Sequence, residues 1–262
     1  MSVPLAEFEV GLRGLRRLSS VAGLLMLLQA MLLAGLLSIR GERVTLPITV
    51  DLPGGDTGER VALCQLDVGV GVVVLCVLVA VARLVLVIPV VGTRLAGRLR
   101  SNDHAARWTE FAFSSSITVF LVAQLNGISD IGALVVIYAI TSGMTLFSVL
   151  QERTTVRSGH PLLPLAFGAA VGIVPWGVIA FHQVGAGVVG DGPSVIVRVI
   201  TLAMLAAGFV FAATQWREQR AVVLRAHRLD GERMHVVLSV TQASLFAWLV
   251  VLGVVLPAGG LG

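Results

Sequence analysis

One apolar stretch, residues 107–130, contains polar groups that its overall hydrophobicity does not explain. It can cross a hydrocarbon core of roughly 30 Å at about 1.5 Å per residue. Yet it contains the carboxylate Glu110, three consecutive serines that begin at Ser114, and the amides Gln124 and Asn126. An ionised carboxylate inside a membrane helix costs at least ~2.5 kcal/mol, so it faces a protein interior and has a partner there. The stretch therefore predicts a buried anion that a cation or hydrogen bonds must neutralise.

Arg83 is the candidate partner for this carboxylate. Counted from Arg94 at the expected membrane surface, Arg83 lies about 16 Å along its helix, and Glu110 lies about 10 to 12 Å into the next helix. Because consecutive spans are antiparallel, the two side chains reach similar depths and can pair directly or through water. The alternative is that the long Arg83 side chain extends back to the surface. Ser114 lies one turn beyond Glu110, so we expect its hydroxyl to donate a hydrogen bond to the carboxylate.

No other group of residues has the spacing of a catalytic or metal site. The sequence pairs no nucleophile with a base, so we expect no enzyme and no catalytic residues. Cys64 and Cys76 are interpreted as free buried thiols. Interfacial positions explain the histidines better than metal ligation does. His104 is expected in a loop, and His160, His182, His227 and His235 near the ends of spans.

Composition places the chain in the cell membrane as a multi-pass protein. Hydrophobic residues make up 56% of the 262 and charged residues 13%, and the mean hydropathy is +0.92. These values exclude a water-soluble fold. The first span is expected to be retained, because its apolar run is too long for a signal peptide. Seven spans are predicted in a single domain of residues 1–262, at about 18–38, 68–92, 108–128, 131–150, 163–183, 194–216 and 234–256.

The distribution of arginine predicts the orientation of the bundle. All 19 basic residues are arginine, and the chain has no lysine. Most arginines flank one side of the expected spans, whereas Arg40, Arg43, Arg60 and Arg198 flank the other. Because loop arginines mark the cytoplasmic side, the N-terminus is predicted inside and the C-terminus outside after seven crossings. The basic character thus reflects topology, and no nucleic-acid partner is expected.

Two local patterns predict departures from plain helix. In residues 43–63, apolar residues alternate and are followed by Pro53-Gly54-Gly55, which predicts a short β-hairpin on the outer face. This hairpin could be a plain connector, a lid over the bundle or a subunit contact. In the fifth span Pro175 is expected to kink the helix, and Trp176 is expected to face the interior.

Four motifs, in order, resemble the heliorhodopsin family. They are RWTEFAFSSSITVFLVAQLNGISDI from Arg107, LQER at 150–153, LLPLAFGAAVGIVPW at 162–176 and GERMHVVLSVTQASLFAW at 231–248. The resemblance covers nearly the whole chain. It implies an all-α, seven-helix, rhodopsin-like bundle that binds all-trans retinal, is inverted relative to other rhodopsins, does not pump ions and is usually a homodimer. In this family the hairpin after the first helix is associated with the dimer.

The resemblance also implies a set of site residues. Glu110 matches the Schiff-base counterion and Ser239 a serine near the Schiff base, while Met144, Trp176 and Trp248 match the surroundings of the chromophore. With the neighbours expected in the same pocket, the candidate cofactor-binding residues are Glu110, Arg83, Ser114, Met144, Trp176, Phe209, Ser239, Ala243 and Trp248.

The chain departs from the family pattern where the cofactor would attach. The family's retinal-bearing lysine matches Ala243, and no lysine elsewhere can form the imine. Two family histidines match Gly23 and Arg83. Arginine cannot transfer protons near neutral pH as imidazole does, but it can offer Glu110 the positive charge that a protonated Schiff base would have offered. We therefore expect no covalent cofactor and an Arg83–Glu110 pair in its place.

Three functions remain open at this point. The favoured one is a light-independent membrane binding or signalling protein with an unidentified membrane or cytoplasmic partner. The second is non-covalent binding of retinal, a carotenoid or another apolar ligand in the inherited pocket. Bulky side chains in that pocket would argue against it, because protein interiors leave few large voids. The third is a small transporter or channel, which the shortage of ionisable residues within the membrane spans disfavours.

Overall fold

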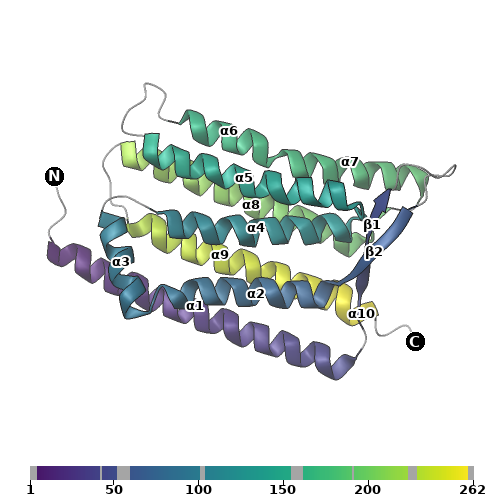
Figure 1. Ribbon diagram of the computed structural model, residues 1–262, viewed down its shortest axis with the longest axis horizontal. Coiled ribbons are helices and arrows are strands. Elements are labelled where there is room, and N and C mark those ends of the chain that lie inside the picture. Colours follow the sequence, from purple (N-terminus) through teal and green to yellow (C-terminus); the bar gives the residue numbers. More distant parts are fainter. Residues whose placement is uncertain are drawn as a thin grey trace.

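The chain folds mainly into long helices that lie side by side (Figure 1). The computed structural model describes residues 5–41, 43–51, 60–100, 104–154, 162–190, 192–223 and 229–258. The helices in these ranges are α1 (Leu5–Arg40), α2 (Val68–Val85), α3 (Pro89–Arg100), α4 (Ala105–Leu125), α5 (Ile131–Thr154), α6 (Leu163–Gly172), α7 (Val174–Val189), α8 (Val195–Val223), α9 (Leu229–Val250) and α10 (Leu256–Ala258). A π-helical segment, Val251–Val255, joins the last two, and the strands are β1 (Thr45–Asp51) and β2 (Arg60–Asp67).

Six helical stretches among the described residues are long and apolar enough to cross a membrane. The prediction of a multi-pass helical membrane protein is confirmed at this level. Large apolar side chains such as Leu24, Phe181 and Leu202 are exposed on the outside of the bundle, as contact with lipid requires. The six stretches are Phe8–Arg40, Val68–Val85, Ile131–Glu152, Leu163–Val189, Val195–Arg220 and Leu229–Val255.

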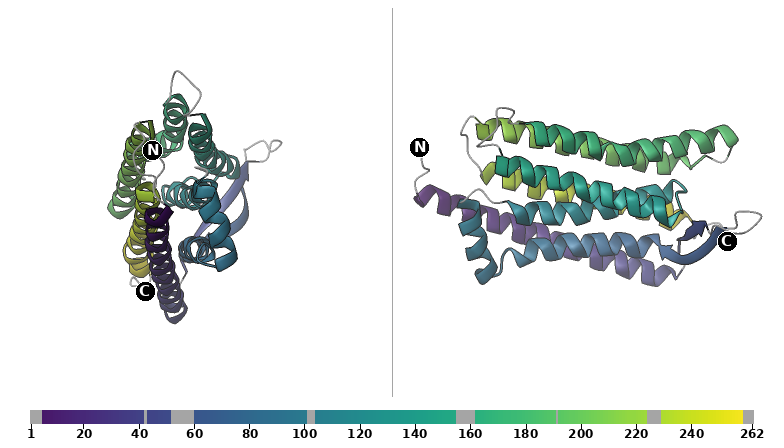
Figure 2. Two further views of the ribbon diagram at one scale, coloured as in Figure 1. Left: turned by 90° about the vertical axis from the view of Figure 1, so that its left-hand side faces the viewer. Right: turned by 45° about the horizontal axis from the view of Figure 1, so that its top comes forward.

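The bundle has two different ends (Figures 1 and 2). At one end α3 lies across the helices, and at the opposite end lies the two-stranded sheet. We call the first the arginine-rich end, since the parts of α1, α3, α4, α8 and α9 found there carry Arg13, Arg16, Arg17, Arg94, Arg98, Arg107, Arg217, Arg220 and Arg233. We call the second the hairpin end.

Helices α4 and α9 lie at the centre of the bundle, between α6 and α7 at one edge and α1 and α2 at the other (Figure 2). Helix α4 contacts α2, α5, α8 and α9. Glycine permits close approach between two of these helices, because a Cβ atom at Gly71 of α2 would lie 2.9 Å from Leu121 of α4. Such small residues are typical of helix contacts in membranes.

The second span is shorter than predicted. Helix α2 ends at Val85 rather than near residue 92, and α3 begins at Pro89, where a missing N–H does not disturb a helix. The region predicted as a loop from residue 94 onward is therefore helical as far as Arg100. Leu95 and Leu99, one turn apart, pack on the core, while Arg98 is exposed, so α3 is amphipathic and suits the membrane surface.

The predicted break in the fifth span is present. Helix α6 ends at Gly172 and α7 begins at Val174. The reason is Pro175, which lacks the N–H that would continue the helical hydrogen bonds. Gly172 also lies against Met144 of α5, since a Cβ atom there would come within 2.6 Å of the Met144 sulfur.

The predicted hairpin is also present. Strands β1 and β2 are antiparallel, and their register shifts between Ile48 and Thr49. Strand β2 extends beyond residue 63 and leads directly into α2, whose first turn is capped by Asp67 through a 3.0 Å bond from Val70 N–H. Residues 52–59, which include the predicted turn, lie outside the described residues. Cys64 in β2 is exposed, contrary to prediction, because the strand lies beyond the helical bundle.

Strand β1 is also bonded to the turn that follows α4. The backbone N–H of Thr49 donates to the Ser129 carbonyl at 2.8 Å, and the two hydroxyl groups lie 3.1 Å apart. The hairpin is therefore attached to α2 through the chain and to the turn between α4 and α5 through these bonds, and β1 also contacts α5.

Candidate functional site

Arg83 and Glu110 form an ion pair inside the bundle. The Arg83 Nη2 atom lies 2.7 Å from Glu110 Oε2, and the two residues are only 2% and 6% exposed. Arg83 is in the last turn of α2 and Glu110 is in the second turn of α4, so antiparallel packing brings them to one level, as the depth count predicts. Each charge balances the other in a region where either one alone would be strongly unfavourable.

Helix α9 supplies the other two partners of Glu110. The Ser239 hydroxyl donates to Oε1 at 2.6 Å, and His235 Nε2 lies 3.2 Å from Oε2. His235 and Ser239 are four residues apart and share one face of α9. Three helices thus converge on a single carboxylate.

Two predictions about this site are wrong. The Ser114 hydroxyl donates to the Phe111 carbonyl of its own helix at 3.4 Å and not to Glu110, because a serine in a helix can bond to the preceding turn. His235 is only 1% exposed and is not at the interface. Helix α9 begins at Leu229, earlier than predicted, so His235 lies well inside the bundle.

A second ionic cluster surrounds Arg107 at the arginine-rich end. Its guanidinium lies 2.8 Å from Glu152 Oε1, 3.0 Å from Glu218 Oε1 and 3.5 Å from Glu232 Oε1. Arg107 is 3% exposed. One cation from α4 therefore joins carboxylates from α5, α8 and α9.

Two further side chains belong to this Arg107 cluster. The indole of Trp108 donates to Glu152 Oε1 at 2.8 Å, and His104 Nδ1 is hydrogen-bonded to Glu232 Oε1. His104 is 6% exposed, so its predicted loop position does not make it a surface residue. Glu152, Glu218 and Glu232 thus each contact the Arg107 guanidinium, and Glu152 and Glu232 are also hydrogen-bonded to Trp108 and His104.

An aromatic cluster contacts both the Arg107 cluster, through the Trp108 indole, and the Arg83–Glu110 pair, through His235. The rings of Phe111 and Phe211 are stacked with centroids 4.0 Å apart. The His235 ring meets Trp108, Phe111 and Phe211 edge-on, at centroid distances of 6.2, 5.9 and 5.2 Å. His235 thus packs edge-to-face with the three aromatic rings, and its Nε2 atom contacts Glu110.

Sequence reasoning missed the Arg107 cluster because each member lies near a helix end. Charges in such positions resemble ordinary membrane-flanking residues. One signal was available, since Glu152 in LQER and Glu232 in GERMH each place a carboxylate at the same end of a span. The described residues at this end therefore include buried ionisable groups that the sequence analysis did not predict.

The Asn126 amide, at the other end of α4, has a structural role. The Asn126 Nδ2 atom donates to Thr201 Oγ1 at 2.9 Å, and Gln183 Nε2 donates to Asn126 Oδ1 at 2.6 Å. These bonds join α7 and α8 to the end of α4, as polar side chains between membrane helices commonly do.

The remaining candidate residues do not all gather around one space. Ala243 is 4% exposed and belongs to the main core, against which Trp176 and Trp248 pack. Met144 packs instead against the cluster of Trp108, Phe111 and Phe211.

Phe209 was predicted in the pocket, and this is wrong. It is 58% exposed, whereas Phe211 is 4% exposed. Two residues along a helix correspond to a rotation of about 200°, so the two rings lie on opposite faces of α8.

These features define a class of protein, a multi-pass helical membrane protein whose central helices are joined by buried ion pairs. Within this class the heliorhodopsin family model matches residues 15–255. The chain therefore belongs to the heliorhodopsin family. A comparison with curated proteins finds no match.

The family generally binds retinal, but the residues present here do not fit a covalently attached one. The chain has no lysine to form an imine. Two cavities lie among the described residues, and Ala243 lines neither of them. One cavity lies at the arginine-rich end, and the other is an apolar hollow between α8 and the C-terminal helical segments that includes Trp248.

The side chains of the site interact through ion pairs and hydrogen bonds. In the described part of the chain, no three His, Cys, Asp or Glu side chains are grouped so that they could hold a metal ion. What the arrangement does is hold opposite charges at short distances between helices.

Proposed function

We propose that this heliorhodopsin works without a covalently bound retinal, as a light-independent membrane binding or signalling protein. The observation that carries the proposal is the 2.7 Å contact between Arg83 and Glu110. By resemblance Glu110 matches the counterion of a protonated Schiff base. Here a guanidinium, which is charged at every physiological pH, supplies the positive charge instead.

The surroundings of Gly23 support this proposal. A Cβ atom at Gly23 would lie 2.8 Å from Leu84 Cγ and 3.2 Å from Arg83 Cβ. Gly23 and Arg83 match the two family histidines, and they are neighbours across the α1–α2 contact. Replacing two imidazoles by a permanent cation and a glycine removes groups that titrate near neutral pH and keeps a positive charge beside Glu110.

We also infer that α4 completes a bundle of seven spans in one domain. Helix α4 has 21 residues, about 31 Å at 1.5 Å per residue, and it is enclosed by α2, α5, α8 and α9. Protein neighbours on these sides bind Arg107 and Glu110 of α4, so it need not meet the apolarity of a lipid-facing helix. The arginine-rich end faces the cytoplasm in this proposal, so the chain starts inside and ends outside. The hairpin is available for contact with a second copy.

Packing around Ala243 weighs against the alternative of a non-covalent polyene. Ala243 is 4% exposed and belongs to the main core, and it does not line either of the two cavities described above. A transporter or channel is also disfavoured, because Glu110, Glu152 and Glu232 are engaged in short ion pairs and hydrogen bonds.

Reconstitution with all-trans retinal tests the proposal. The purified protein is mixed with retinal, excess ligand is removed, and the absorption spectrum is recorded beside that of Ala243→Lys. We expect no visible band shifted to the red of free retinal in the unmodified protein. A retained red-shifted band there would overturn the proposal.

A matched control places the amine one turn away, in Ala247→Lys, which is also fully buried in the native chain. A band in Ala243→Lys and not in Ala247→Lys would support the assignment of residue 243 as the position of the lost attachment. Equal results for the two substitutions would contradict that assignment.

A further inference from the structure

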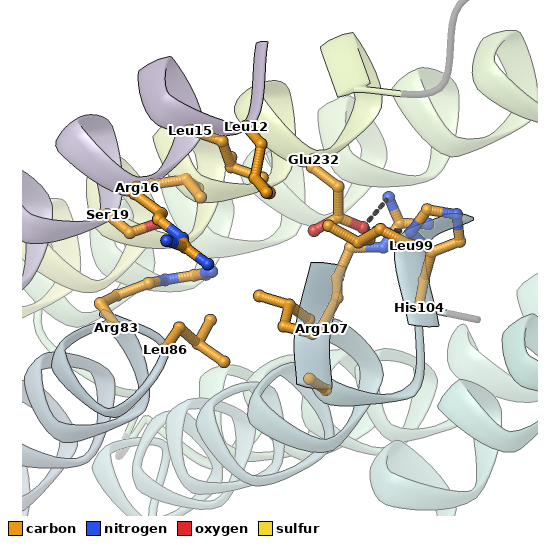
Figure 3. Close-up of a pocket in the computed structure, with 13 residues that line it drawn as sticks. Leu12, Leu15, Arg16, Ser19, Arg83, Leu86, Leu99, His104, Arg107 and Glu232 are labelled. Carbon is orange, nitrogen blue, oxygen red and sulfur yellow. Dashed lines mark hydrogen bonds and ion pairs between the residues drawn. The ribbon is translucent and has the colours of Figure 1, made fainter. Parts of the chain in front are cut away.

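A cavity at the arginine-rich end lies between α1, α2, α3, α4 and α9 (Figure 3). The space between these helices is about 490 Å³ when its open mouth is included, but only about 20 Å³ of it can hold the centre of a water-sized sphere, so the cavity suits a very small ligand. Its apolar walls are mainly leucine side chains. Its polar lining consists of Arg16, Ser19, Arg83, His104, Arg107 and Glu232.

Arg16 contributes a positive charge that is not matched locally. Among the described residues, its guanidinium has no ion pair, and its Nε atom is buried without a hydrogen-bond partner. Helix α3 covers it, since a Cβ atom at Gly92 would lie 2.9 Å from Arg16 Nη2. By contrast Arg13 and Arg17 on the same helix are exposed. Arg16 therefore cannot be treated as an ordinary membrane-flanking charge.

Arg83 presents a second buried donor to the same cavity. Its Nη2 atom is bound to Glu110, but within the described part of the chain its Nε atom has no hydrogen-bond partner. Figure 3 shows the side chains of Arg16 and Arg83 extending into one part of the cavity, from α1 and α2, with Ser19 beside them. A buried donor that lacks a partner is unfavourable, so this arrangement favours an acceptor between them.

The charges on the cavity wall decide which kind of acceptor fits. Arg16 and Arg83 carry two positive charges, and Glu110 balances one of them. Glu232 also lines the cavity, but it is bound to His104 and lies 3.5 Å from Arg107. After pairing with Glu110, Arg16 and Arg83 together keep one net positive charge. A divalent anion would bring a second negative charge, which Glu232 would repel.

We propose that a small monovalent anion, with the size and charge of chloride, binds between the Arg16 and Arg83 guanidinium groups. The Ser19 hydroxyl is placed to donate to the same ion. The leucine side chains on the walls make the surroundings less polar and so strengthen the attraction between the ion and the two cations. This site is independent of whether the protein binds retinal.

Thermal unfolding of the purified full chain tests the proposal. Sodium chloride replaces sodium gluconate stepwise at constant ionic strength, so that general screening does not change. We expect the unfolding temperature to rise with chloride and to saturate, since an ion that binds only the folded state stabilises it. The absence of any chloride dependence in the unmodified protein would overturn the proposal.

The variant Arg16→Gln should lose the chloride-dependent rise, because it removes the unmatched charge. Arg17→Gln is the matched control, since Arg17 is the next residue of α1 but is exposed. It should keep the full rise, and an equal loss in both variants would contradict a site at Arg16.

A direct measurement keeps the test decisive if Arg16→Gln does not fold. Crystals of the unmodified protein grown with sodium bromide should give an anomalous diffraction peak between Arg16 and Arg83. Bound bromide at other positions only, or no peak at all, would refute the assignment.

Discussion

Breaking the Arg83–Glu110 pair should destabilise the protein more than the loss of any exposed ion pair. Arg83→Met leaves a carboxylate that is 6% exposed with Ser239 and His235 as its remaining partners. Removing one member of a buried pair typically costs about 3–5 kcal/mol. Glu110→Gln leaves the guanidinium unpaired and should cost a similar amount.

The double variant Arg83→Met/Glu110→Gln removes both charges together. Because no unpaired charge then remains, we expect its total cost to be close to that of one single substitution. The resulting coupling energy should therefore be about as large as the cost of one single substitution, about 3–5 kcal/mol, which is at or above the upper end of values for directly contacting residues.

Equilibrium unfolding in mixed micelles, followed by the fluorescence of the four tryptophans, measures these free energies. The Arg60–Asp51 pair of the hairpin is the matched control. Its atoms are 3.3 Å apart, but its side chains are 71% and 59% exposed, so its coupling should lie within about 0–1 kcal/mol. Additive effects of Arg83→Met and Glu110→Gln, or a coupling no larger than that of the control pair, would refute the interpretation of Arg83 as the charge partner of Glu110.

Three further substitutions have distinct expected outcomes, each measured as a change in unfolding free energy. Ser239→Ala should cost about 1.5–3 kcal/mol, because it removes a 2.6 Å bond to a carboxylate, whereas Ser114→Ala should stay within about 0.5 kcal/mol. Arg107→Met should cost about 3–5 kcal/mol or more, since it leaves three carboxylates without their cation, and stability should recover as acid protonates them; no recovery would contradict this reasoning. Gly172→Val should cost about 1–3 kcal/mol through overpacking against Met144, and adding Met144→Ala should restore part of the loss, with no restoration counting against the contact.

Depth along a helix could be predicted from the sequence, because the rise per residue is constant and successive spans are antiparallel. This is why the contact between Arg83 and Glu110 was predictable. The hairpin and the break at Pro175 were predictable for a different reason, because local residue patterns determine them. Each of these features depends on residues close in sequence or on two consecutive helices.

The rotation of each helix about its own axis, and which helices are its neighbours, could not be predicted in the same way. The choice between Phe209 and Phe211 depends on which face of α8 is buried, and both rings sit in an apolar stretch that offers no polar face for comparison. The Arg107 cluster requires α4, α5, α8 and α9 to be mutual neighbours, which no local pattern indicates. The position of His235 depended on where α9 begins, and helix boundaries are the least certain part of a sequence-based assignment.

The hairpin has a mechanical consequence for the helices that carry the ion pair. Strand β2 runs into α2, and β1 is bonded to the turn after α4, while Arg83 and Glu110 join the same two helices near their opposite ends. The hairpin thus links the start of α2 to the turn that follows α4, and the ion pair links the same two helices near their other ends. A force on the hairpin therefore acts on both α2 and the turn after α4, and sliding α2 past α4 requires the buried Arg83–Glu110 pair to break as well.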